Sequence, residues 1–117
     1  MSVNATLPML ALRLTVYNHP GVMAHICGMF ARRAFNVEGI FVMPIGDTGT
    51  SRIWLLVHED EHLEQLMRQT RKLHDVIEVV PLPGGVEAFQ RFDAFMTAWE
   101  AMIPPSFLAQ PRDKDKA

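Results

Sequence analysis

The sequence contains one cysteine, Cys27, and no apolar run that approaches the roughly 20 residues needed to cross a bilayer. A single thiol can form neither an internal disulfide nor a cysteine-based metal site, so we expect Cys27 to be reduced and packed as a small hydrophobic side chain. The amino-terminal residues lack the basic stretch and long apolar run of a secretory signal. These absences predict a cytoplasmic protein that does not bind the membrane.

The basic and acidic side chains of the sequence nearly balance. Its 11 basic and 13 acidic side chains give a net charge of −2, whereas a protein that neutralises many phosphates has a clear basic excess. A sheet that binds RNA would need aromatic and basic residues on its central strands, and the first predicted strand offers only Tyr17 at its end. We therefore expect no nucleic-acid partner.

Patterns that indicate catalysis are scarce as well. There is no glycine-rich phosphate loop, and Cys27 has no obvious histidine partner. The run from His58 to His62 matches the His-Glu-x-x-His zinc pattern, which needs both imidazoles on one helix face. Here His58 ends a predicted strand and Asp60 begins the next helix. The sequence therefore predicts no catalytic residue and no metal site.

Apolar periodicity in the 117 residues predicts one α+β domain. The predicted elements are, in order, a strand over 10–18, a helix over 22–34, strands over 37–45 and 51–58, a helix that Asp60 caps, and a strand over 76–80. The order β-α-β-β-α-β is that of the ferredoxin-like fold, a four-stranded antiparallel sheet with both helices on one face. The domain is expected to occupy residues 8–82.

The second face of this predicted sheet is apolar and has no helix to cover it. It would carry Trp54 and Leu56, together with either Ile40 and Val42 or Phe41 and Met43. An uncovered apolar face is typical of a surface that binds a partner, so we expect at least a homodimer.

Two segments follow the predicted domain. Residues 83–103 carry apolar and aromatic side chains at three- and four-residue intervals, which predicts an amphipathic helix. We favour the interpretation that this helix covers part of the sheet; the alternative is a helix that docks on another chain. Residues 104–117 begin with two prolines and end in alternating charges, which predicts a flexible charged tail.

A candidate ligand site lies where the first strand gives way to the first helix, in the run Asn18-His-Pro-Gly-Val-Met23. The first amides of a helix have no partners within the helix and meet the positive end of its dipole, so they can bind a carboxylate. Gly21 allows close approach to the backbone, and the Asn18 amide can both donate and accept. Asn36 is a second amide that a neighbour paired through the sheet would bring near. The alternative is a turn with no ligand, and the residues alone do not decide between the two.

The run from Asn18 to Ile40 resembles the opening of the ACT domain in the small, regulatory subunit of acetolactate synthase (acetohydroxyacid synthase). The match continues in order along the chain and spans about residues 10–80. It includes Ser51-Arg-Ile-Trp-Leu-Leu-Val57, Leu63-Glu-Gln-Leu66 and Lys72-Leu-His-Asp-Val-Ile-Glu-Val79. Longer members of the family have a second carboxy-terminal domain, so the sequence resembles the short type.

The resemblance implies a non-catalytic regulatory subunit that controls a catalytic large subunit. Two ACT domains would hold valine, or another branched-chain amino acid, at their interface and mediate activation and feedback inhibition of branched-chain amino-acid biosynthesis. Asn18, Gly21, Val22 and Met23 of one copy would bind the ligand, with Asn36 contributed across the homodimer. No cofactor is expected in this chain; thiamine diphosphate, Mg and FAD are expected on the catalytic partner.

Other functions are compatible with the same fold. A free-standing amino-acid sensor would keep the ligand site and act on another enzyme or regulator. An acylphosphatase-like hydrolase would need an arginine in the loop after the first strand, and none lies between Asn18 and Met23. The choice among valine, leucine and isoleucine stays open, since one methylene changes binding by only about 1–3 kcal/mol.

Overall fold

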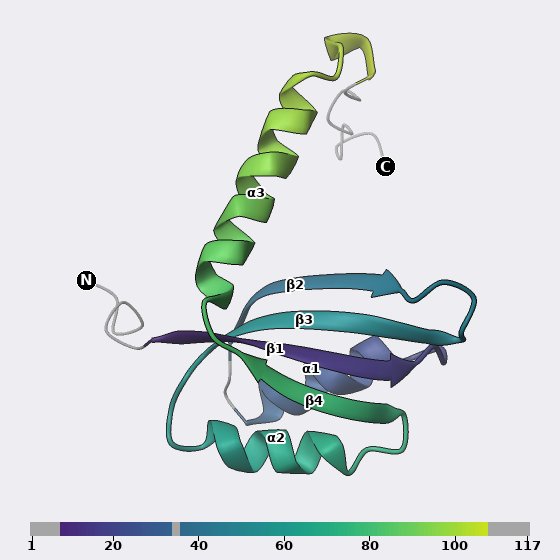
Figure 1. The fold of residues 1–117 in the computed structure, drawn as a ribbon, viewed down its shortest axis with the longest axis vertical. Helices are drawn as coiled ribbons and strands as arrows, with labels where there is room; N and C mark the ends of the chain where they lie inside the picture. Colours follow the sequence, from purple (N-terminus) through teal and green to yellow (C-terminus); the bar gives the residue numbers. More distant parts are fainter. Residues whose placement is uncertain (1–7, 34–35, 108–117) are drawn as a thin grey trace, which may run out of the picture.

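A computed structural model describes residues 8–33 and 36–107. Its elements are β1 (Met9–Tyr17), α1 (Val22–Arg32), β2 (Val37–Pro44), β3 (Thr50–His58), α2 (Leu63–Arg71), β4 (Val76–Leu82), α3 (Gly85–Ala101) and a single 3-10 turn, Pro105–Phe107. The strands form one antiparallel sheet in the order β2-β3-β1-β4. Helices α1 and α2 lie together on one face of it (Figure 1). The ferredoxin-like α+β prediction is confirmed.

The core lies between the sheet and these two helices. The alternation predicted for β1 and β3 is present, because Leu12, Leu14 and Val16 are buried on the same face as Ile53, Leu55 and Val57. Helix α1 contributes Ile26 and Phe30, and α2 contributes Leu66 and Met67. Side chains at i, i+3 and i+4 share one face of a helix, so these two apolar stripes both turn toward the sheet.

The start of α2 differs from the prediction. Asp60 does not cap the helix, which begins at Leu63. Its carboxylate accepts the His62 amide at 2.7 Å, and its carbonyl accepts the Leu63 amide at 3.2 Å. Asp60 therefore shapes the turn that precedes the helix, as short polar side chains commonly do.

The two histidines of the zinc-like pattern lie in different environments. His58 is buried at the end of β3, with its Nε2 3.0 Å from the Glu38 carboxylate. His62 is exposed at the start of α2. Across residues 8–33 and 36–107 no group of three His, Cys, Asp or Glu side chains could hold a metal ion. No helix in the same residues is long and apolar enough to span a membrane.

The open face of the sheet, opposite α1 and α2, carries Phe41 and Trp54. These cross-strand partners have ring centroids 5.4 Å apart. Ile40 and Val42 point to the other face, where they pair with Leu55 and Ile53 but remain about 40% exposed (42% and 38%). β2 is an edge strand, and α1 covers little of it. The apolar surface therefore extends over the open face and around the β2 edge.

Helix α3 covers the open face only with its first two turns. Gly85 packs on Ala11 of β1, Phe89 lies over Gly39 of β2, and the Phe92 ring lies 4.6 Å from that of Phe41. Beyond Phe92 the helix leaves the sheet (Figure 1). The prediction that this helix covers part of the sheet is correct for the first two turns and wrong for the rest. Of the predicted tail, residues 108–117 lie outside the described residues.

Candidate functional site

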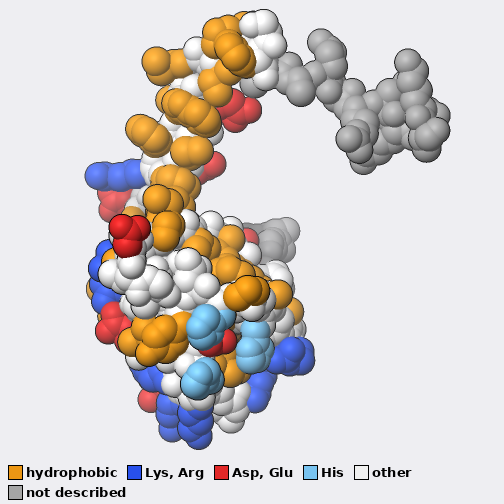
Figure 2. All heavy atoms as spheres, turned by 90° about the vertical axis from the view of Figure 1, so that its right-hand side faces the viewer, with side chains coloured by type: hydrophobic (Ala, Val, Ile, Leu, Met, Phe, Trp, Pro, Cys, Tyr) orange, Lys and Arg blue, Asp and Glu red, His pale blue; other side chains and the backbone are white. Residues whose placement is uncertain are grey.

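The predicted ligand loop lines a cavity at the end of the sheet where β1 gives way to α1. Four of the five predicted ligand-binding residues line it: Asn18, Gly21, Val22 and Met23. The cavity measures about 100 Å³, well below the roughly 300–1,000 Å³ of sites for drug-sized ligands. Figure 2 looks at this end of the molecule, where histidine side chains gather around an acidic group. The size suits a small molecule, or one half of a site shared with a second chain.

Several backbone amides at the N-terminus of α1 are hydrogen-bond donors without an acceptor. Gly21 has a φ of +85°, a left-handed conformation that favours glycine, and it precedes the first helical residue. The amides of Gly21, Met23 and Ala24 have no acceptor within the described part of the chain. The Val22 amide does have one, the His19 carbonyl at 3.3 Å. Three free amides at the positive end of a helix dipole have the geometry and charge to bind an anion such as a carboxylate.

Two polar side chains at this cavity also lack partners. The Asn18 backbone amide donates to the Gly49 carbonyl at 2.9 Å, while its side-chain amide is exposed and bonds to no described residue. Ser51 is only 5% exposed, and its hydroxyl has no protein partner among the described residues either. A hydroxyl and a carboxamide can both accept a hydrogen bond from an ammonium group.

The loop is fixed in place by the residues around it. The His19 Nδ1 lies 2.6 Å from the Asp75 carboxylate at the start of β4, and the His19 ring stacks on Tyr17 at 5.8 Å. The Tyr17 amide donates to the Asp75 carbonyl at 2.8 Å. These contacts join the end of β1 to the start of β4, so the cavity is preformed in a single chain.

Asn36 is not part of this cavity in the single chain. It is exposed, immediately before β2, whereas the cavity meets β2 at Val42 near the other end of the strand. Of the five predicted site residues, the structure therefore brings four together and leaves Asn36 apart. The sequence prediction also omitted His19, Val42 and Ser51. A signal for Ser51 was present in the sequence. It lies two residues before Ile53 in the alternation with Leu55 and Val57, so it was expected on the face of the sheet that the helices cover.

Three larger cavities are less suited to a zwitterion. One, of about 230 Å³, lies between α3 and the open face and is lined by Phe41, Trp54 and α3 side chains, without a hydrogen-bonding side chain apart from the indole. Another, of about 440 Å³, is lined by Glu59, Asp60, Glu61 and Glu64, which would repel a carboxylate, and its basic residue Arg71 already donates to the Val79 carbonyl at 3.1 Å. A third, of about 280 Å³, is lined by Gly84, Glu87, Ala88 and Arg91, and its two charged side chains pair with each other at 2.8 Å. The cavity at α1 combines free donors, free acceptors and an apolar wall.

Comparison with known proteins gives a consistent picture. A family model described as "AHAS small subunit-like ACT domain" matches residues 12–78. The chain is 59% identical over 92 residues to the acetolactate synthase isozyme 1 small subunit of Escherichia coli K12, which covers 79% of this chain and 96% of that protein. It is 41% identical over 73 residues to the acetolactate synthase small subunit of Bacillus subtilis, covering 61% of this chain and 42% of that protein.

Solved structures agree with this match. The crystal structure of the acetolactate synthase small subunit of Thermotoga maritima superposes with a TM-score of 0.60 at 34% identity, covering 67% of this chain and 49% of that one. The chain thus spans nearly the whole of the short E. coli relative and about half of the longer relatives. The family model matches residues 12–78, which lie within the βαββαβ domain.

Proposed function

Because the chain belongs to the family of acetolactate synthase small subunits with an ACT domain, we propose that it binds valine, or leucine or isoleucine, and thereby regulates the catalytic large subunit. The names of its relatives support a regulatory, non-catalytic role. The observation that carries the ligand proposal is the set of free amides of Gly21, Met23 and Ala24 beside a small, partly apolar cavity.

Each part of a branched-chain amino acid has a complementary group at this cavity. The carboxylate would accept hydrogen bonds from the free amides at the mouth of α1. The ammonium would donate to the Asn18 carboxamide and the Ser51 hydroxyl. The side chain would pack on Val22, Val42 and Ile53, and its full burial contributes about 1.5–3 kcal/mol.

The edge position of β2 supports a site completed by a second copy. The outer side of β2 has no strand partner in a single chain, and an unpaired edge can pair with the same edge of another chain. If two copies pair antiparallel through β2 about its centre, the start of one strand lies opposite the end of the other. Asn36 of the partner subunit would then lie near Val42, at the rim of the cavity. The homodimer would thus bring all five predicted site residues together.

Regulation follows if the catalytic subunit binds the free and the valine-bound dimer differently. We expect the free dimer to activate the large subunit and valine to weaken that activation, with a coupling free energy of about 1–3 kcal/mol. Thiamine diphosphate, Mg and FAD would belong to the large subunit, where the chemistry takes place. Two observations would distinguish this role from that of a free-standing sensor. The chain should co-purify with a thiamine-dependent subunit, and adding valine should reverse its activation of that subunit.

Isothermal titration of the purified chain with each branched-chain amino acid tests the ligand proposal. Valine is expected to bind with one ligand per shared site. Its D-enantiomer should bind at least tenfold more weakly, because with its carboxylate on the amides and its ammonium at Asn18 and Ser51 its isopropyl group would point away from the apolar wall of the cavity. Absence of heat from all three amino acids, with crystals soaked in excess valine that hold only water in the cavity, would contradict it.

Replacing Asn36 with alanine tests whether the site is shared. Valine affinity should fall about tenfold, which corresponds to the loss of one hydrogen bond to a charged group. The melting temperature in the absence of ligand should not change, since Asn36 is exposed and has no partner among the described residues. Titration calorimetry and a thermal melt on the same preparation measure both. A loss of stability with unchanged valine affinity would assign Asn36 to the turn alone.

A further inference from the structure

The second half of α3 exposes an apolar surface that no part of the described chain covers. Phe95 is 66% exposed, Trp99 51% and Met102 81%. Figure 2 shows hydrophobic side chains along the helix that rises away from the domain. With Phe92 and Met96 they follow the three- and four-residue spacing of a helix that packs along one face. Such a face in water is typical of a surface that meets another protein.

The path of α3 shows where this apolar surface lies relative to the sheet. The helix starts on β1 through Gly85 and Ala11, passes over β2 through Phe89 and Gly39, and makes its last ring contact with Phe41 of β2. It therefore crosses the open face toward the β2 edge and continues past it (Figure 1). A second copy paired through β2 would have its own open face on that side.

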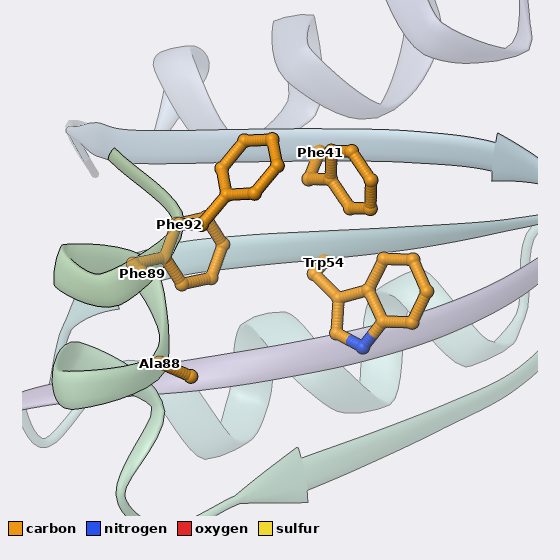
Figure 3. Close-up of a pocket in the computed structure, with 5 residues that line it drawn as sticks. All are labelled: Phe41, Trp54, Ala88, Phe89 and Phe92. Atoms are coloured by element: carbon orange, nitrogen blue, oxygen red, sulfur yellow. The ribbon is translucent and has the colours of Figure 1, made fainter. Parts of the chain in front are cut away.

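The open face of the sheet has a cavity that can accept apolar side chains from another helix. The cavity of about 230 Å³ in the angle between α3 and the sheet is lined by Phe41, Trp54, Ala88, Phe89 and Phe92 (Figure 3). Figure 3 shows the rings of Phe41 and Trp54 standing on the sheet and facing the space beside α3. Aromatic rings pack well in such edge-to-face or offset arrangements, so the cavity suits apolar side chains from another helix.

Charge favours the same pairing. From Phe92 to Ile103 the helix carries Asp93 and Glu100 and no basic residue. The open face carries Arg13 and Arg52; Arg52 is exposed without a partner in the described chain, and the buried Nε of Arg13 has no acceptor. Only Arg13 is neutralised, by Glu78 at 3.1 Å. An acidic arm would therefore approach a basic, aromatic surface.

The area of the interface provides a further argument. Pairing of two edge strands of eight residues buries a narrow strip, whereas stable protein interfaces bury about 1,200–2,000 Å² in total. Two arms, each with four large apolar side chains, would supply the missing apolar area. Both arms lie on the side of the sheet opposite α1 and α2, so they would not obstruct the ligand cavity.

We propose that the second half of α3 is a dimerisation arm, which packs across the shared β2 edge onto the open face and α3 of a second copy of this chain. The proposal rests on the β2-paired dimer of the proposed function. Its apolar contacts are Phe95, Met96, Trp99 and Met102 of one copy and the Phe41–Trp54 cavity of the other.

Sedimentation equilibrium of the full chain tests the arm. The double variant Met96→Lys with Trp99→Lys places two charges on the exposed apolar face and is expected to raise the dimer dissociation constant at least tenfold. The matched control, Thr97→Lys with Ala101→Lys, adds the same charges to the opposite face of the same helix and should leave that constant within twofold. Circular dichroism verifies that both variants keep the helix.

A third variant separates the arm from the β2 edge. Ile40→Lys places two lysines near each other at the centre of the paired edges and should also weaken the dimer. A weakened Ile40→Lys dimer with an unaffected arm variant would overturn the arm and retain the proposed function. A wild-type chain that stays monomeric at every concentration, with or without valine, would overturn both. An arm variant that dimerises normally but no longer activates the catalytic subunit would overturn the arm in favour of a docking surface for that subunit.

Discussion

Replacing Gly21 with aspartate is expected to reduce valine affinity by more than 100-fold and to abolish feedback inhibition. Gly21 lines the ligand cavity, and a β-carbon at this position would meet no atom within 4 Å, so the new carboxylate has room at the mouth of α1. There it would occupy the amides that we assign to the ligand carboxylate. Two like charges about 4 Å apart repel by roughly 4 kcal/mol at an effective dielectric constant near 20, and each 1.4 kcal/mol is about tenfold in affinity.

Gly21→Asn is the matched control for this substitution. Asparagine and aspartate have nearly the same shape, and both tolerate the φ of +85° better than other non-glycine residues. The backbone strain is therefore common to both variants, and the difference between them reports the charge. Calorimetry should find the asparagine variant weakened far less than the aspartate variant. Equal affinities in the two variants would mean that no carboxylate binds at this helix end.

The sequence was sufficient for the four strands and the first two helices, because their apolar residues follow simple periods. The alternation of Leu12, Leu14 and Val16 and the helical spacing of Ile26 and Phe30 are both retained in the core. The errors lie at boundaries. Asp60 satisfies the general rule for a helix cap, yet it lies two residues before the N-cap residue His62, and only the path of the backbone decides between these two positions.

The third helix illustrates a different limit. Its pattern predicted an apolar face correctly, but a pattern does not specify what covers that face. The small residues at its start, Gly85 on Ala11, bring the helix axis close to the sheet at one end. The sheet is only four strands wide, and the helix crosses it obliquely, so its far end extends past the β2 edge. The length of the helix and the width of the sheet together leave its second half exposed.

The lining of the candidate site was predictable where it comes from one continuous stretch of sequence, and less so where it comes from other strands. A glycine next to a helix start is visible in the sequence, which led to Asn18, Gly21, Val22 and Met23. Ser51 and Val42 come from other strands and join the cavity only through the sheet register. Asn36 stays a prediction, since its contribution depends on a second copy.

Gly85→Ala is expected to lower the free energy of unfolding by about 1–3 kcal/mol, the usual cost of forcing a methyl group into a filled space. The added carbon would overlap the Cβ of Ala11 and lie 3.0 Å from its amide nitrogen. Ala11 cannot retreat, because it is 2% exposed and β1 is hydrogen-bonded to β3 and β4 on either side. The helix must move instead. Urea denaturation followed by circular dichroism measures the change.

Two companion variants make this result specific to the contact. Gly28→Ala introduces the same methyl group inside α1, where its nearest neighbour is the end of the Arg32 side chain at 3.5 Å. This variant should be more stable by about 0.5–1 kcal/mol, because alanine has a higher helix propensity than glycine. Ala11→Gly combined with Gly85→Ala moves the methyl group from the strand to the helix. That pair should recover part of the lost stability, but not all, since the Ala11 backbone still lies close.

Gly85→Ala also tests whether the position of α3 on the sheet affects formation of the dimer. Seventeen residues extend about 25 Å from Gly85, so a small rotation at the first residue moves Trp99 by several ångströms. If the arm packs on a second copy, Gly85→Ala should weaken the dimer as well as the fold, and Ala11→Gly should restore both in parallel. A dimer of unchanged affinity beside a destabilised fold would mean that the orientation of α3 does not matter to assembly, which is incompatible with an arm that reaches across the β2 edge.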